Sequence, residues 1–88
     1  MKIYRYELEL IGDPSVPMPK GAQVLSVSTE RGRLECWALV DPMTAEVEVR
    51  EFRVVGTGSP APDDLGRFIG TVLVYGGHLV FHVFEATR

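Results

Sequence analysis

The sequence predicts an all-β domain of six short, mainly antiparallel strands in a small sandwich or barrel, with at most one short helical turn near residues 62–66. Apolar and polar residues alternate with a period of two along several segments, which is typical of half-buried strands. Clusters of glycine, proline and aspartate separate these segments, and no window carries an apolar stripe at helical spacing for three turns. At 88 residues, the chain is expected to form a single domain over residues 1–88.

The strands are expected between strong turn signals. The first covers residues 4–10 and ends at a turn that begins at Gly12. Residues 16–21 contain Pro17 and Pro19, which remove two backbone donors, so this segment is predicted to be an extended connector on the surface rather than a helix or a central strand. The other strands are expected at residues 23–29, 33–40, 45–55, 67–75 and 78–85.

The segment 45–55 changes phase in its middle. Apolar side chains occupy odd-numbered positions up to Val49 and even-numbered positions from Phe52. A one-residue insertion moves side chains to the opposite face, so the shift predicts a β-bulge near Arg50–Glu51. The stretch 56–66, rich in turn-forming residues, is predicted to be the long loop of the domain.

The last two strands are predicted to form a hairpin with a two-residue turn at Gly76–Gly77, and both of its faces are apolar. A β domain of this size has one interior, so the second face either closes a barrel seam within the chain or meets another copy. We expect a homo-oligomer, most simply a two-fold dimer. The expected interface residues are Val80, His82 and Phe84.

Charge and cysteine content limit the classes of partner. The formal net charge of −3 argues against a general nucleic-acid binder. The single cysteine, Cys36, cannot form an intrachain disulfide, which fits a reducing compartment, and it is either a small buried hydrophobe or a reactive thiol. The N-terminal segment has no continuous apolar region, and no apolar run is long enough to span a membrane. We therefore expect a cytoplasmic protein without a membrane partner.

No combination of residues indicates a reaction, and we expect no enzymatic activity, no catalytic residues, no cofactor and no metal site. His78 and His82 on one strand would lie about 13 Å apart, too far to share a metal ion. His82 is either a hydrogen-bonded packing residue or a base. Gly56, Thr57 and Gly58 follow a strand and form either an ordinary turn or an anion nest of backbone amides.

A binding site is expected around Trp37, Arg53 and the start of the long loop at Gly56, Thr57 and Gly58. Trp37 stands between two small residues, which favour close packing in the core and leave the indole on the opposite side, open to a partner or ligand. The alternative is that Trp37 completes the core. Arg53 follows the predicted bulge, and bulges often redirect side chains at functional edges.

Several short motifs, each present once, follow one another along almost the whole chain and match those of a known family. They are Ile3-Tyr4-Arg5-Tyr6, Met18-Pro19-Lys20-Gly21-Ala22, Leu25-Ser26-Val27, Trp37-Ala38-Leu39-Val40-Asp41-Pro42, Gly56-Thr57-Gly58, Ile69-Gly70-Thr71 and Val80-Phe81-His82-Val83-Phe84-Glu85. With these motifs the chain resembles a family of very small proteins of unknown function, encoded mostly by tailed phages and prophages. Members often carry histidine after Gly-Thr-Gly, where this chain has Ser59. The resemblance implies a phage or prophage origin, hence the host-cell cytoplasm, and no known activity.

Two functions remain open from the sequence. The first is a non-enzymatic phage or prophage accessory protein, a self-associating interaction module that binds a host or phage protein. The second is a small-ligand or nucleotide-binding protein, such as a sponge for an immune signalling nucleotide. In that case Trp37 is expected to stack on the ligand, and Arg50 or Arg53 to pair with phosphate.

Overall fold

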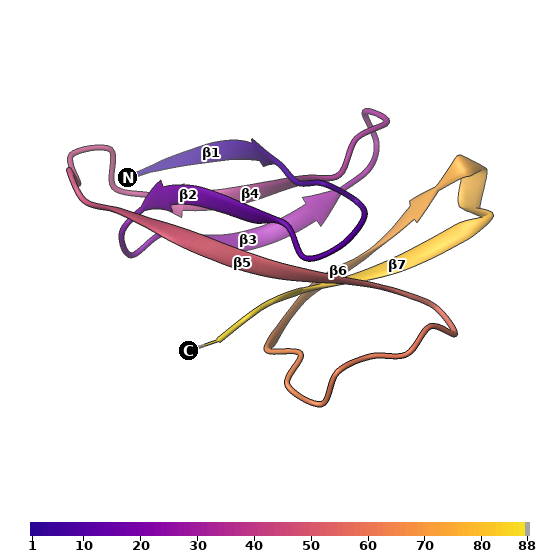
Figure 1. The fold of residues 1–88 in the computed structure, drawn as a ribbon. Helices are drawn as coiled ribbons and strands as arrows, with labels where there is room; N and C mark the ends of the chain where they lie inside the picture. The colour runs from indigo at the N-terminus through magenta and orange to yellow at the C-terminus, as the bar shows by residue number, and fades with distance from the viewer. Residues whose placement is uncertain (88) are drawn as a thin grey trace.

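The computed structural model describes residues 1–87, which form two antiparallel sheets packed face to face (Figure 1). The three-stranded sheet has the order β1 (Lys2–Glu7), β4 (Glu35–Val40), β3 (Gln23–Ser28). The four-stranded sheet has the order β2 (Ser15–Pro19), β5 (Val47–Gly56), β7 (Leu79–Glu85), β6 (Arg67–Val74). The predicted all-β fold is confirmed as a sandwich. Within residues 1–87 no hydrogen-bonded ladder joins the two sheets, so the barrel is not closed.

The core lies between the sheets and follows from the period-two pattern. In β4, Cys36, Ala38 and Val40 have no exposed surface, and they face Phe52 and Val83 of the four-stranded sheet, which are also fully buried. The first strand lies earlier in the chain than predicted, since β1 runs from Lys2 to Glu7 rather than over residues 4–10.

Residues 15–19 form a seventh strand, β2, where the sequence predicted only a connector. The Lys20 amide donates to the carbonyl of Glu46 at 2.9 Å. Because bonded and non-bonded pairs alternate along an antiparallel ladder, the nitrogens of Pro17 and Pro19 point away from β5, where no donor is needed. The two prolines therefore fit an edge strand, and the side chain of Met18 between them is only 1% exposed.

The predicted bulge near Arg50–Glu51 is wrong. Neither the pairing of β5 with β2 nor its pairing with β7 contains a register shift, and covered and exposed positions alternate regularly through this point. Glu48 and Arg50 point inward, while Val47 and Val49 are 65% and 55% exposed. The apolar pattern changes phase because polar side chains occupy one end of the interior, and the backbone keeps its phase.

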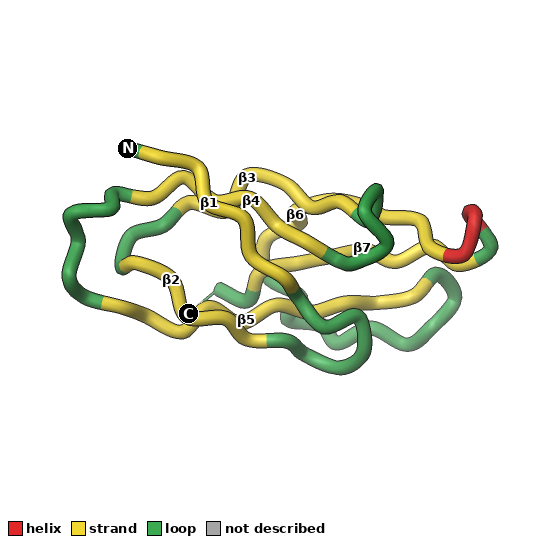
Figure 2. The backbone as a smooth tube through the Cα atoms, turned by 90° about the horizontal axis from the view of Figure 1, so that it is seen from above, coloured by secondary structure: helices red, strands yellow, loops and turns green. Residues whose placement is uncertain are grey.

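The turns also differ from the prediction. β6 and β7 are joined by four residues, Tyr75–His78, which include a short 3-10 turn (red in Figure 2) rather than a two-residue hairpin turn. Positive φ angles of 66° at Gly76 and 91° at Gly77 explain the two glycines. No helical turn forms at residues 62–66, which belong to an irregular loop. In the described part of the chain, no helix is long and apolar enough to cross a membrane.

Cys36 is a packing residue. Burial raises the pKa of its thiol, the nearby Glu85 carboxylate raises it further, and together they bring it to about 12 despite the opposing charge of Arg50. A thiol reacts as its thiolate, so we expect Cys36 of the folded protein to resist a disulfide reagent at about pH 8 and to react rapidly once denatured. Rapid labelling of the folded protein would contradict this assignment.

Candidate interaction surface

One face of the four-stranded sheet points away from the core and is largely apolar over β6 and β7. Alternation along β7 places Phe81, Val83 and Glu85 toward the interior, so the residues between them point outward. The outer β6–β7 face consists of three cross-strand pairs: Phe68 with Phe84, Thr71 with His82, and Leu73 with Val80. Phe68 and Leu73 are 54% and 56% exposed, which is unusual for large apolar side chains that lie on one face.

An aromatic pair lies at one end of this face. The ring centroids of Phe68 and Phe84 are 5.4 Å apart with an interplanar angle of 61°, an edge-to-face arrangement. Such pairs stabilise each other by about 0.5–1.5 kcal/mol beyond the area they bury. The pair therefore forms a rigid apolar contact surface.

His82 occupies the middle of the outer β6–β7 face between two threonine hydroxyl groups. Its Nε2 lies 2.8 Å from Thr57 Oγ1, and its Nδ1 lies 3.0 Å from Thr71 Oγ1. Both ring nitrogens therefore have partners inside the protein, which fixes the orientation of the imidazole. The sequence left two roles open for His82, a hydrogen-bonded packing residue and a base. This geometry fits the packing residue.

The Gly56–Thr57–Gly58 segment forms a turn closed by its own hydrogen bonds. The Thr57 amide donates to the carbonyl of Val80 and the Ser59 amide to the carbonyl of Gly56, both at 3.0 Å. Gly58 has a φ of 85°, a conformation that favours glycine. Two amides that could line an anion nest are therefore directed at carbonyl groups of the chain.

Arg53 fastens the long loop to the sheet. It lies opposite Phe84 on the outer side of β5, and its guanidinium group donates to the backbone carbonyl of Asp64 and lies 3.5 Å from the carboxylate of the same residue. The loop runs along this side of the sheet (Figure 1). The contacts of Arg53 thus explain why the loop stays close to β5.

Trp37 lies in the other sheet. It is paired with Arg5 and Ser26, and its neighbours Cys36 and Ala38 are fully buried, so the indole points away from the core as the small flanking residues predicted. Trp37 and Arg53 project from opposite outer faces of the sandwich. The structure therefore does not bring them together into one site.

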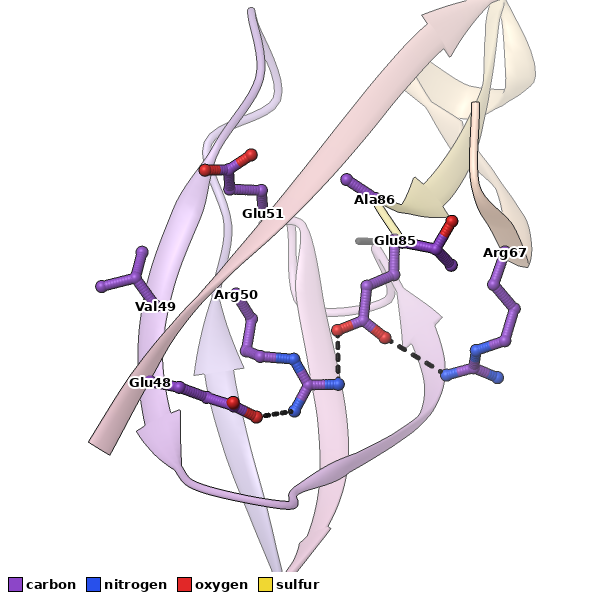
Figure 3. A pocket seen from close by; sticks show the side chains of 8 residues that line it. Glu48, Val49, Arg50, Glu51, Arg67, Glu85 and Ala86 are labelled. Atoms are coloured by element: carbon purple, nitrogen blue, oxygen red, sulfur yellow. Dashed lines mark hydrogen bonds and ion pairs between the residues drawn. The ribbon is translucent and has the colours of Figure 1, made fainter. Parts of the chain in front are cut away.

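A polar pocket of about 500 Å³ lies beside the first half of β5, beyond the point where β7 ends (Figure 3). Its lining residues are Glu48, Val49, Arg50, Glu51, Arg67, Glu85, Ala86 and Thr87. At its centre the Glu85 carboxylate forms ion pairs with two arginines. Arg50 Nη2 lies 2.6 Å from Oε2, and Arg67 Nη2 lies 3.4 Å from Oε1. The side chain of Glu85 is only 7% exposed.

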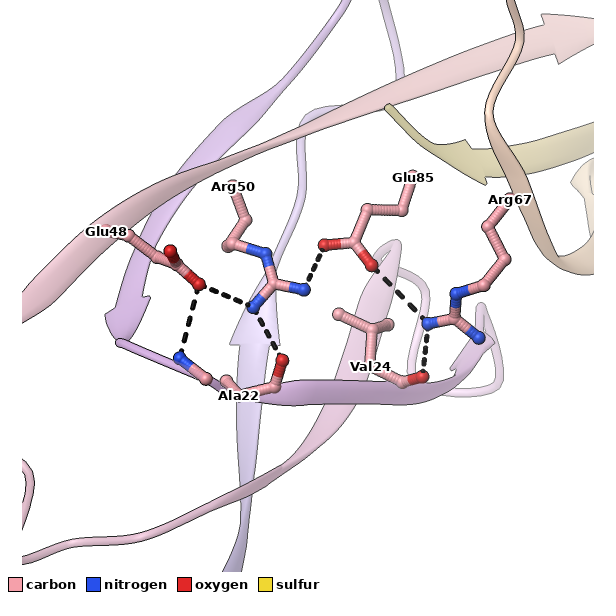
Figure 4. A network of polar contacts seen from close by, with 7 residues as sticks. Ala22, Val24, Glu48, Arg50, Arg67 and Glu85 are labelled. Atoms are coloured by element: carbon pink, nitrogen blue, oxygen red, sulfur yellow. Dashed lines mark hydrogen bonds and ion pairs between the residues drawn. The ribbon is translucent and has the colours of Figure 1, made fainter. Parts of the chain in front are cut away.

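The same arginines connect the two sheets (Figure 4). Arg50 Nη1 donates to the carbonyl of Ala22 at 2.6 Å, and Arg67 Nη2 donates to the carbonyl of Val24 at 2.8 Å. Glu48 lies 3.2 Å from Arg50, so two carboxylates and two guanidinium groups neutralise one another. The lining residues Glu48, Arg50, Arg67 and Glu85 are paired with one another and join the sheets, which favours a structural role over a ligand site.

The change of apolar phase within residues 45–55 is the sequence signal of this network, and it reflects inward charged side chains rather than a bulge. Glu48 and Arg50 share the phase of the buried Phe52, and Glu85 shares the phase of the buried Val83. Charged residues of opposite sign at inward positions of two strands are the pattern of an internal ion pair.

Comparison with known proteins identifies a family for the chain but no activity. The family model described as "Domain of unknown function (DUF7352)" matches residues 1–88. No curated protein and no solved structure matches the chain.

Proposed function

Since the chain belongs to the DUF7352 family of domains of unknown function, we propose its function from its surface: it is a non-enzymatic interaction module that self-associates through the outer β6–β7 face. The observation that carries this proposal is the pair of exposed apolar side chains, Phe68 and Leu73, on one outer face of the sheet. Fully burying a large apolar side chain contributes roughly 1.5–3 kcal/mol. Phe68 and Leu73 keep about half of their surface exposed in the single chain, so a second copy that covers them gains part of this amount at each position.

The arrangement of the face fits a second copy of the same chain. The hydrogen-bonded pair Thr71–His82 lies between an aromatic pair and an aliphatic pair. A two-fold axis that passes through this polar centre and runs across the strands, in the plane of the face, places the aromatic pair of one copy against the aliphatic pair, Leu73 and Val80, of its partner. Because the imidazole already has its hydrogen-bond partners, covering it leaves neither ring nitrogen unsatisfied.

We expect the wild-type protein to be a dimer at micromolar concentration and Phe68→Glu to be a folded monomer. The substitution places a charge in the apolar contact between the aromatic pair of one copy and the aliphatic pair of the other, and the exposed position leaves the core untouched. Sedimentation velocity measures the assembly, and circular dichroism verifies the fold. Met43→Glu is the matched control, since Met43 is 88% exposed in a turn outside this face and its substitution is expected to leave the dimer intact. A monomeric wild type, or a dimeric Phe68→Glu variant, would sink the proposal.

On the resemblance described above, we propose a phage or prophage origin, action in the host-cell cytoplasm, and a host or phage protein as the partner of the dimer. The small-ligand alternative has less support, because Arg53 is engaged by Asp64 and Trp37 lies in the other sheet. Recovery of a small molecule in native mass spectra of the purified protein would favour that alternative.

A further inference from the structure

His82 lies at the centre of the outer β6–β7 face, and it is the only one of the six residues of that face whose side chain can carry a charge. Histidine is the residue whose charge ordinarily changes between about pH 5 and 8. A second copy of the chain therefore covers either a neutral ring or a cation, depending on the pH.

The hydrogen bonds around the ring fit its neutral form. The Thr57 hydroxyl group donates to the carbonyl of Val80 at 3.3 Å, so its oxygen accepts the proton of His82 Nε2, 2.8 Å away. His82 Nδ1 then carries no hydrogen and accepts the hydroxyl proton of Thr71, whose oxygen is 3.0 Å away. A proton added at Nδ1 turns this acceptor into a donor, and the Thr71 hydroxyl group loses the acceptor of its own hydrogen.

Within residues 1–87, the sheet around His82 offers no carboxylate to a protonated ring. On the outer face β6 contributes only uncharged side chains, and the residue paired with His82 on β5 is Val55. The nearest charged residue on this side of β5 is Arg53, about 7 Å from Val55 along the strand, and Glu51 lies about 13 Å from Val55. The closer of these two charges is a cation.

The long loop carries two carboxylates, Asp63 and Asp64. Asp64 is held by Arg53, whose guanidinium group lies 3.5 Å from its carboxylate and also donates to its backbone carbonyl. Both aspartates are exposed, so water and salt screen their charges. The groups at hydrogen-bond distance from the His82 ring are two threonine hydroxyl groups, which do not neutralise a cation.

The two-fold axis of the proposed dimer sets His82 of one copy opposite His82 of the other, because it passes through the Thr71–His82 pair. A protonated ring at this place is covered by apolar side chains and faces a second cation. Burying a charge without a partner is costly, and like charges repel strongly once water is excluded. Neither cost applies to two neutral rings.

We propose that the dimer is pH-sensitive and that His82 is its sensor: the copies associate while the imidazole is neutral and separate when it is protonated in mild acid. This inference rests on the dimer proposed above. The separated chains bind protons at His82 that the dimer excludes, so acid favours the separated chains, and the dimer is fully formed above the titration range of histidine.

The charge of the whole chain acts in the opposite direction. The net charge is −3 at pH 7 and approaches zero near the isoelectric point of about 5.3, which lessens the repulsion between two copies. General electrostatics therefore favours association in mild acid. Dissociation in mild acid distinguishes the imidazole from this background.

Sedimentation velocity at about pH 8 and about pH 6 tests the proposal, with circular dichroism at each pH to verify the fold. The Kd of the wild-type dimer is expected to be at least about tenfold higher at the lower pH, since each dimer excludes two protons. His82→Gln, which is neutral and keeps an amide donor and acceptor, should have the same Kd at both. His78→Gln is the matched control: His78 lies in the β6–β7 turn outside this face, so the pH dependence should remain.

The outcomes separate the sensor from the dimer. A wild type with the same Kd at both pH values contradicts the sensor and leaves the dimer intact, whereas a wild type that is monomeric at both contradicts the two proposals together. An equal pH dependence in His82→Gln and the wild type assigns the effect to other groups and overturns the sensor.

Proton uptake by His82 itself provides a readout that does not require His82→Gln to fold or to dimerise. The chain contains two histidines, so His78→Gln leaves His82 as the single source of imidazole NMR signals. At one pH within the titration range, the protonated fraction is expected to be smaller at a protein concentration well above the Kd than at one below it. Equal fractions at the two concentrations contradict the proposal.

Discussion

Replacing Arg50 with methionine is expected to lower the free energy of unfolding by about 3–5 kcal/mol, because removal of one partner leaves a buried charge uncompensated. The Arg50 side chain is 19% exposed, and its guanidinium group makes the 2.6 Å contact with Glu85, which is 7% exposed. After the substitution, Glu85 keeps only the longer contact to Arg67 at 3.4 Å. The bond from Arg50 to the opposite sheet is lost at the same time. Urea denaturation monitored by fluorescence measures the change.

Two further variants distinguish the cost of leaving a buried charge without a partner from the cost of losing an ion pair anywhere in the protein. Arg33→Met breaks the pair with Glu7, whose two side chains are 70% and 58% exposed, and is expected to cost less than about 1 kcal/mol. Arg50→Met combined with Glu85→Leu removes both charges and should recover much of the stability lost in the single variant. If Arg50→Met is as stable as Arg33→Met, the network does not hold the two sheets together.

Phe52→Ala is expected to cost about 3–5 kcal/mol, the range for removing a fully buried aromatic ring. This loss is large for a domain of this length, since total stability is typically about 0.05–0.15 kcal/mol per residue. Trp37→Ala serves as the aromatic control: it removes a larger ring, but from an outer face, so we expect a smaller loss and a folded protein. Thermal melting compares the two variants. A larger loss for Trp37→Ala would show that the indole belongs to the structural core.

The strands with one clear apolar face could be predicted from the sequence. Residues 35–40 alternate regularly, so the inward side chains of β4 follow from the pattern, although the strand begins at Glu35 rather than at residue 33. The presence of β3 follows from the sequence as well, but its register shift between Val24 and Ser26 does not. β2 could not be predicted in the same way, because the effect of a proline depends on which side of the strand its nitrogen faces, and only the register with β5 decides this. The inward position of Arg50 could not be predicted for a related reason. The carboxylate that neutralises its charge belongs to Glu85 in β7, 35 residues later in the sequence.

The candidate surface was predictable in part. Val80, His82 and Phe84 share a face because they are two residues apart, and they do lie on one outer face. Which face of this strand points to the core depends on the opposing sheet, since both faces are apolar. The placement of Trp37 relative to Arg53 required the order of the strands, which the alternation of single segments does not contain.

The order of the four-stranded sheet has a consequence for synthesis of the chain. β7 is synthesised after the other six strands described here, yet it occupies an interior place between β5 and β6. Until residue 85 has emerged, β5 and β6 have no neighbour between them, and the buried Phe52 and Val72 lack the cover of Val83. The sheet therefore closes after its residues are translated rather than progressively during translation. Chains at this stage expose the unpaired edges of β5 and β6 at once, and unpaired strand edges favour aggregation.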